Sequence, residues 1–246
     1  MVTETEPNGA DVCDPPDPAT GGADNPHASR DRSSVGEIVV GAVLMAAVAV
    51  VGIYLSYRPN GNPVDRWVFH LVPDSRNGLV TGITRFRYPA VIVAGSVVLG
   101  LVTVRRDWTR ALACAAGPPL ALLVGELVVK PAVGRTLGSS FSYPSGSTVG
   151  AAALAMALVL AASPRWRVLA VAVAAAYALW MTVAVLALRW HFPTDVMAGL
   201  ALGVGLVLVV DGGVWWAARG LGMADRRPLR GRVGTARGGP PAHPAS

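Results

Sequence analysis

The chain has 246 residues, of which 52% are hydrophobic and only 15% are charged, and its mean hydropathy is +0.47. This composition is too apolar for an ordinary soluble domain and indicates a membrane protein. The net charge of +6 does not indicate nucleic-acid binding, because the charge is unevenly distributed and residues 226–246 carry five arginines and no acid. Such a tail is typical of a segment beside an anionic membrane surface.

The first segment, residues 1–35, is rich in Pro, Gly, Asp and Asn, and we expect a disordered acidic tail. It lacks the basic start and short apolar core of a cleaved signal peptide. Residues 36–220 are expected to form one membrane domain, and residues 221–246 a basic disordered tail. No disulfide is expected, because Cys13 lies in the polar tail and Cys114 in an apolar run.

Six apolar stretches follow in chain order, at residues 38–57, 88–104, 111–129, 148–162, 168–188 and 196–218. A helix needs about 20 residues to cross a hydrocarbon core of ~30 Å, so the second and fourth stretches need flanking residues to span it. Helices satisfy their own backbone hydrogen bonds in lipid. The sequence therefore predicts an all-α, polytopic membrane protein with a bundle of six transmembrane helices.

The orientation follows from the arginines. The connections 105–110 and 163–167 and the C-terminal tail are arginine-rich, and the positive-inside rule places them on the cytoplasmic side. Both termini are then cytoplasmic in a multi-pass protein of the cell membrane. Two loops, 130–147 and 189–195, fall on the extracytoplasmic side and hold nearly all the polar chemistry at membrane depth.

The first of these loops begins with Lys130, the only lysine of the chain. One interpretation is an interfacial cation that pairs with Glu126 one helical turn earlier. The other is a phosphate ligand, which Arg135 five residues later would support. Lys130 alone does not decide between them.

The same loop ends in Pro144-Ser145-Gly146-Ser147, at the start of a small-residue helix. Ser145 or Ser147 can cap that helix, and the free N–H groups of its first turn attract anions. Gly146 allows an anion to approach the backbone closely. The alternative is an ordinary capped helix start.

The second loop contains "RWHFPTDVMAG" at residues 189–199. Here Asp195 follows His191 by four residues, a spacing at which a carboxylate can reach the imidazole ring. A carboxylate bound to one ring nitrogen fixes the tautomer and supports the ring as a nucleophile or base. Alternatively, Asp195 only stabilises the helix N-terminus and His191 lies at the membrane interface.

Taken in order, "KPAVGR", "YPSGS" and "HFPTDVMAG" resemble the three motifs of the type 2 phosphatidic acid phosphatase superfamily, which includes lipid phosphate phosphatases and relatives of vanadium haloperoxidases. The resemblance covers about residues 60–212. It implies that His191 attacks phosphorus and forms a phosphohistidine, that Asp195 orients it, and that Lys130, Ser145 and Gly146 surround the phosphoryl group. It implies a phosphorylated lipid as partner and neither a metal nor a cofactor.

The chain departs from these motifs at three places. Leu137 stands where the first motif usually has arginine, and Val185 stands where the third usually has arginine. Ser147 occupies the place of the histidine that protonates the leaving group. Whether Arg189 replaces the missing third-motif arginine is left open by the sequence.

Loss of a positioned general acid typically costs about 10²–10⁴ in rate. A lipid alkoxide leaving group suffers most, whereas a departing phosphate needs far less protonation. We therefore expect a lipid phosphatase that prefers polyprenyl or other lipid diphosphates over phosphatidic acid. The alternative is a catalytically silent relative that binds or helps transport phosphorylated lipids through Lys130, Arg135 and the helix N-terminus. A small transporter has less support, because no internal repeat is evident.

Overall fold

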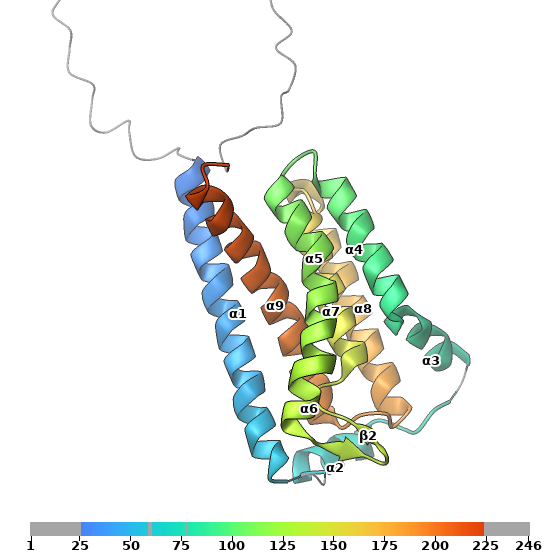
Figure 1. Cartoon of the computed structure of the whole chain (residues 1–246). Coiled ribbons are helices and arrows are strands. Elements are labelled where there is room, and N and C mark those ends of the chain that lie inside the picture. The colour runs from blue at the N-terminus through green and yellow to red at the C-terminus, as the bar shows by residue number, and fades with distance from the viewer. Residues whose placement is uncertain (1–25, 59–60, 77, 224–246) are drawn as a thin grey trace, which may run out of the picture.

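The computed structural model describes residues 26–58, 61–76 and 78–223 (Figure 1). Four helical segments in it are long and apolar enough to cross a membrane, namely Ser33–Ser56, Trp108–Val133, Pro164–Ala187 and Pro193–Gly220. They belong respectively to α1 (Pro26–Ser56), to α5 (Trp108–Val124) with its continuation, to α8 (Arg167–Ala187) preceded by the 3₁₀ turn η3 (Pro164–Trp166), and to α9 (Pro193–Gly220). The protein is thus a multi-pass, helical membrane protein.

The other two predicted spans are helical but shorter. Helix α4 (Pro89–Thr103) follows α3 (Gly78–Ile83) and the 3₁₀ turn η1 (Thr84–Arg87), and the pair is bent by 61° at the break. Helix α7 (Gly146–Ala161) has 16 residues. Length and composition therefore give four spans, or five if the bent pair counts as one, and the count of six stays a prediction.

Residues 58–87, which connect the first two predicted apolar stretches, contain a further helix, α2 (Pro63–Leu71). Asn62 and Asp65 cap its start reciprocally, because each side chain accepts a hydrogen bond from the backbone N–H of the other. Pro63 suits the first helical turn, where no N–H partner is needed. This local signal sets the start of α2, which lies at the end of the bundle (Figure 1).

Helix α9 is the centre of the bundle and packs against α1, α5, α7 and α8 (Figure 1). Close approach of backbones requires glycine at two of these contacts. A Cβ on Gly41 would lie 2.5 Å from the carbonyl oxygen of Gly205, and a Cβ on Gly203 would overlap that of Val149. In lipid, where apolar tails cover apolar side chains equally well, such backbone proximity is what holds helices together.

The start of α1 and the end of α9 lie at the same end of the bundle as the turn between α4 and α5 (Figure 1). Arg30 joins the two helices through an ion pair of 3.0 Å with the fully buried Asp211. Helix α1 begins at Pro26, so its first turns fall within the segment that was expected to be a disordered tail. Residues 1–25 and 224–246 lie outside the described residues, and the side of the membrane stays a prediction.

Candidate functional site

The predicted site loops meet at the opposite end of the bundle, beside α2 (Figure 1). Helix α5 continues there into η2, a π-helical turn (Gly125–Val129), and α6 (Lys130–Val133). A short antiparallel hairpin follows, β1 (Thr136–Leu137) with β2 (Ser140–Phe141), and leads into α7. The loop between α8 and α9 lies against this hairpin, since His191 contacts Ser142.

A cavity of about 280 Å³ opens among these segments. Four of the predicted residues line it together, namely Lys130, Gly146, Ser147 and His191. The other lining residues are Arg87, Pro89, Leu122, Leu123, Glu126 and Leu127. The cavity therefore unites parts of all three motifs with an arginine and a glutamate that the sequence had not assigned to the site.

Lys130 is aimed into the cavity by the π-helical turn. Its backbone N–H bonds the carbonyl of Gly125, five residues earlier, so the turn is one residue wider than an α-helical turn. Its ammonium group lies 2.7 Å and 2.8 Å from the two carboxylate oxygens of Glu126. Lys130 thus pairs with Glu126, and the pair lies inside the cavity, while its role as a phosphate ligand stays a prediction.

The imidazole of His191 is held by a backbone group. Its Nδ1 lies 2.8 Å from the carbonyl oxygen of Ser142. A carbonyl only accepts, so we assign the proton to Nδ1, and the lone pair is then on Nε2. Burial lowers the pKa of His191 to about 4; the bond to Ser142 opposes this shift, and the positive charges of Lys130 and Arg87 add to it. The ring is therefore neutral at physiological pH, as a nucleophile must be.

A test of this electrostatic setting is the pH dependence of His191 modification. Diethyl pyrocarbonate acylates the unprotonated imidazole, and a pKa lowered to about 4 keeps that form in excess down to about pH 5. We expect the reaction assigned to His191, by difference from His191→Ala, to persist well below the midpoint of about 6.5 that an ordinary histidine shows. Removal of the charge in Arg87→Gln should move the midpoint upward. A midpoint at pH 6 or above in the unmodified chain contradicts the assignment.

The carboxylate of Asp195 was expected to bind the imidazole ring of His191, but its hydrogen bonds go to other groups. Its Oδ1 lies 2.6 Å from Arg135 Nη1, and its Oδ2 accepts the backbone N–H of Phe192. Ser142 is bound to the same arginine, because its backbone N–H and its hydroxyl donate to the carbonyl of Arg135 at 2.8 Å and 3.4 Å. The link between Asp195 and His191 is therefore indirect and runs through Arg135 and Ser142.

Arg135 is fully buried and does not line the cavity. Its Nη2 lies 2.9 Å from Asp65, which also accepts the backbone N–H of Thr194. A buried guanidinium requires counter-ions, and Asp65 and Asp195 supply them. In this structure Arg135 ties α2, the hairpin and the start of α9 together, and its expected phosphate-binding role stays a prediction.

Arg189 also lies outside the cavity. Its Nη2 donates to the carbonyls of Phe69 and Val72 at 2.8 Å and 2.9 Å, and its guanidinium stacks on the ring of Phe69. These carbonyls are at the C-terminal end of α2, where a cation is favoured by the helix dipole. Arg189 therefore does not replace the missing third-motif arginine in this geometry.

Ser145 precedes the cavity wall and is fully buried. Its backbone N–H donates to the carbonyl of Asp195, but its side chain does not cap α7. Among the described residues, its hydroxyl has no hydrogen-bond partner. Ser145 does not line the cavity, unlike Gly146 and Ser147, so its expected role in phosphate binding stays a prediction.

Arg87 is a cation of this cavity that the sequence motifs did not predict. It reaches the cavity from η1 and stacks over the ring of Trp190 at 4.6 Å. Within the described part of the chain, no carboxylate pairs with it. The only sequence signal was its position directly before the Tyr88-Pro89 helix start, at the outer end of a predicted span.

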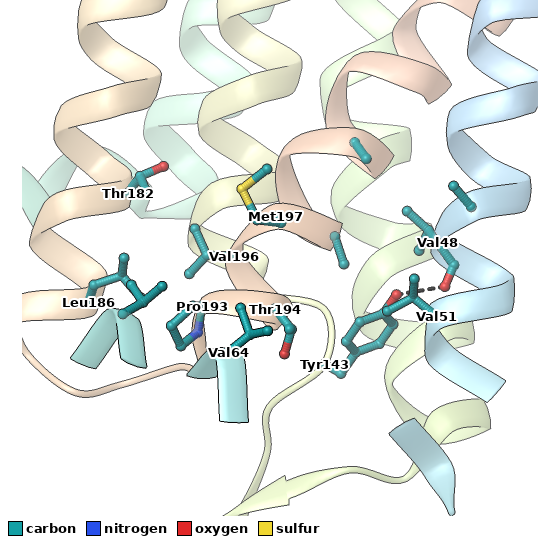
Figure 2. Close-up of a pocket in the computed structure, with 14 residues that line it drawn as sticks. Val48, Val51, Val64, Tyr143, Thr182, Leu186, Pro193, Thr194, Val196 and Met197 are labelled. Carbon is teal, nitrogen blue, oxygen red and sulfur yellow. Dashed lines mark hydrogen bonds between the residues drawn. The ribbon is translucent and has the colours of Figure 1, made fainter. Parts of the chain in front are cut away.

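A second cavity, of about 450 Å³, lies between α1, α2, α8 and α9 (Figure 2). Its walls are apolar, with Val48, Val64, Leu186 and Met197 among them, and no charged side chain lines it. Tyr143 donates a hydrogen bond of 2.6 Å to the carbonyl of Val48 at its edge (Figure 2). Because no charged side chain lines this cavity, it does not suit a phosphoryl group.

The described residues contain no cluster of three or more His, Cys, Asp or Glu side chains that could hold a metal ion.

The fold and the site together define the class of this protein. It is a multi-pass helical protein with a cavity at one end of its bundle that contains cations and a histidine. The chain matches the PAP2 superfamily model over residues 89–219, and it belongs to that superfamily, as the motifs predicted. It is similar to a solved structure described as the first transmembrane PAP2 type phosphatidylglycerolphosphate phosphatase from Bacillus subtilis, with a TM-score of 0.47 and 23% identity, covering 74% of this chain and 95% of that one. The comparison with curated proteins gives no match.

Proposed function

We propose that this protein is an integral membrane lipid phosphatase that hydrolyses a phosphorylated lipid, with lipid diphosphates preferred, through a phosphohistidine on His191 at the extracytoplasmic face. The observation that carries the proposal is that Lys130, Arg87 and the first turn of α7 line one cavity with the neutral ring of His191. Phosphoryl transfer requires a nucleophile and fixed positive charge around the equatorial oxygens, and the neutral imidazole and the two cations of this cavity suit those roles.

In the first step, His191 Nε2 attacks phosphorus while the bond to the leaving oxygen breaks. Lys130 and Arg87 stabilise the charge on the phosphoryl oxygens, and the N–H groups at the start of α7 add donors. The family usually has arginines at the positions of Leu137 and Val185. In this chain Arg87 supplies positive charge in their place. Asp195 acts at one remove, through Arg135 and Ser142.

An apolar part of the cavity wall supports the proposal that the substrate is a lipid. Leu122, Leu123 and Leu127 of α5 and η2 form it, and the side chains of Leu123 and Leu127 are 54% and 69% exposed on the outside of the bundle. In a bilayer this surface faces lipid tails. A substrate with its phosphate in the cavity can therefore keep its hydrocarbon chain in the membrane.

The preferred leaving group follows from Ser147, because a serine hydroxyl is a poor proton donor at neutral pH. We expect detergent-purified protein to release phosphate from a polyprenyl diphosphate at least about 10-fold faster than from phosphatidic acid, in line with the cost of a missing general acid. Equal or faster turnover of phosphatidic acid contradicts the preference. No release from any lipid phosphate, with binding that persists and falls in Lys130→Ala, establishes the silent lipid-binding relative instead.

The role of Arg87 is tested by anion binding, independently of turnover. Charge-assisted hydrogen bonds are worth about 1.5–3 kcal/mol, so Arg87→Gln should weaken binding of orthovanadate, a phosphate mimic, by at least about 10-fold. The matched control is Arg85→Gln, since Arg85 lies on the same turn, is exposed and does not line the cavity. Equal loss in both variants, or loss in neither, contradicts a specific role for Arg87.

A further inference from the structure

Glu126 places a carboxylate inside a cavity that otherwise suits an anion. Its side chain is 45% exposed, and both oxygens face Lys130. It lies so close to Gly146 that a Cβ built on that residue would overlap Glu126 Oε1. The carboxylate therefore lies against the first turn of α7, next to Ser147, which stands at the acid–base position of the second motif.

The backbone fixes this placement. The π-helical turn begins at Gly125 and ends just before Lys130, so it carries Glu126 and Lys130 together to the cavity. Because Lys130 contacts both oxygens at 2.7 Å and 2.8 Å, the carboxylate is held in one orientation. Glycine at 146 leaves the space that it needs.

The ion pair with Lys130 accounts for part of this placement, and a carboxylate inside a cavity for phosphate also offers a chemical role. The second half of a phosphohistidine cycle supplies one. Water is a weak nucleophile, and its attack is accelerated by a group that accepts its proton. Ser147 cannot serve in this way at neutral pH, whereas an ionised carboxylate can.

We propose that Glu126 is the general base of the hydrolytic step, an inference that rests on the proposed function. The water oxygen forms a bond to phosphorus as the bond between phosphorus and His191 Nε2 breaks, and the bonding electrons return to Nε2. The proton of the water passes to the Glu126 carboxylate. Inorganic phosphate leaves, and Glu126 releases its proton to solvent.

This role accounts for the substrate preference in a second way. A group that is ionised when the substrate binds can accept a proton but has none to donate to the first leaving group. A lipid diphosphate does not need that donation, because its leaving group is a phosphate. The cavity thus contains a proton acceptor for the second step. For the first step it requires a substrate whose leaving group needs no proton.

The test is Glu126→Gln in the full-length, detergent-purified protein with a polyprenyl diphosphate labelled on its terminal phosphate. Glutamine keeps the shape and, through its one amide oxygen, one of the two hydrogen bonds from Lys130, but it is a poor proton acceptor. We expect labelled phosphohistidine to form within about 3-fold of the wild-type rate, while steady-state phosphate release falls by about 10²-fold and the phosphoenzyme accumulates. Glu126→Asp should recover part of the release.

Lys130→Gln is the comparison variant, because loss of Lys130 should slow phosphoenzyme formation itself. If Glu126 only positions Lys130, then Glu126→Gln behaves like Lys130→Gln, formation and release fall together, and the inference is overturned. Release at the wild-type rate in Glu126→Gln overturns it as well. A wild-type protein that forms no phosphohistidine and releases no phosphate rejects the proposed function, and the role of Glu126 with it.

Discussion

Ser147→His is expected to raise the turnover of phosphatidic acid by about 10²–10⁴-fold, the range that a positioned general acid contributes. Ser147 lines the same cavity as His191, and the 280 Å³ of that cavity leave room for an imidazole. The gain should be much smaller for a polyprenyl diphosphate, whose leaving phosphate needs little protonation. The quantity to measure is therefore the ratio of kcat/KM for the two substrates.

The control is Ser147→Ala, which removes the hydroxyl without adding an acid and should leave that ratio unchanged. Adding His191→Ala to Ser147→His should abolish the gain, because the new histidine only assists the nucleophile. A substrate ratio that does not shift towards phosphatidic acid in Ser147→His means that proton donation is not what limits this site.

His191→Ala should reduce phosphate release by on the order of 10³-fold or more, since the loss of a covalent nucleophile removes the whole pathway through the intermediate. No labelled phosphoenzyme should form. The matched control is His70→Ala, because His70 is exposed on α2 and does not line the cavity. The two variants distinguish loss of the nucleophile from loss of any histidine at this end of the bundle.

Phosphate release that survives in His191→Ala contradicts the phosphohistidine route. Orthovanadate binding in the same variant gives a second reading, because Lys130 and Arg87 remain. Binding that is retained while release is lost separates the chemical role of His191 from a role in folding.

The buried Arg135 shows why some motif residues line the cavity and others do not. Its position in "KPAVGR" suggested a phosphate ligand, as did its distance of five residues from Lys130. What decides its partner is Asp65, 70 residues earlier in the chain, which reaches it only after α2 folds across the bundle end. The capping signal of Asn62 and Asp65 is typical of a helix start, but it does not predict that the capping oxygen, Asp65 Oδ2, also binds Arg135.

The same holds for His191 and Asp195. Their spacing is compatible with a direct hydrogen bond, yet the stronger demand on Asp195 comes from Arg135, which would otherwise be an unpaired buried charge. The imidazole then takes the nearest backbone acceptor, Ser142. The spacing of two residues shows which hydrogen bond they can form. Whether they form it depends on other charged groups nearby, here Arg135.

The sequence by itself determined the membrane class, the positions of the apolar helices and the family, because these depend on composition, on runs of apolar residues and on short motifs, which are local properties. It also identified Lys130, Gly146, Ser147 and His191, which the structure brings together. Only the tertiary structure decided that Arg87 and Glu126 enter the cavity while Arg135 and Arg189 do not. The reason is that a charged side chain takes its place from the counter-ions and carbonyls around it, and those come from segments far away in the chain.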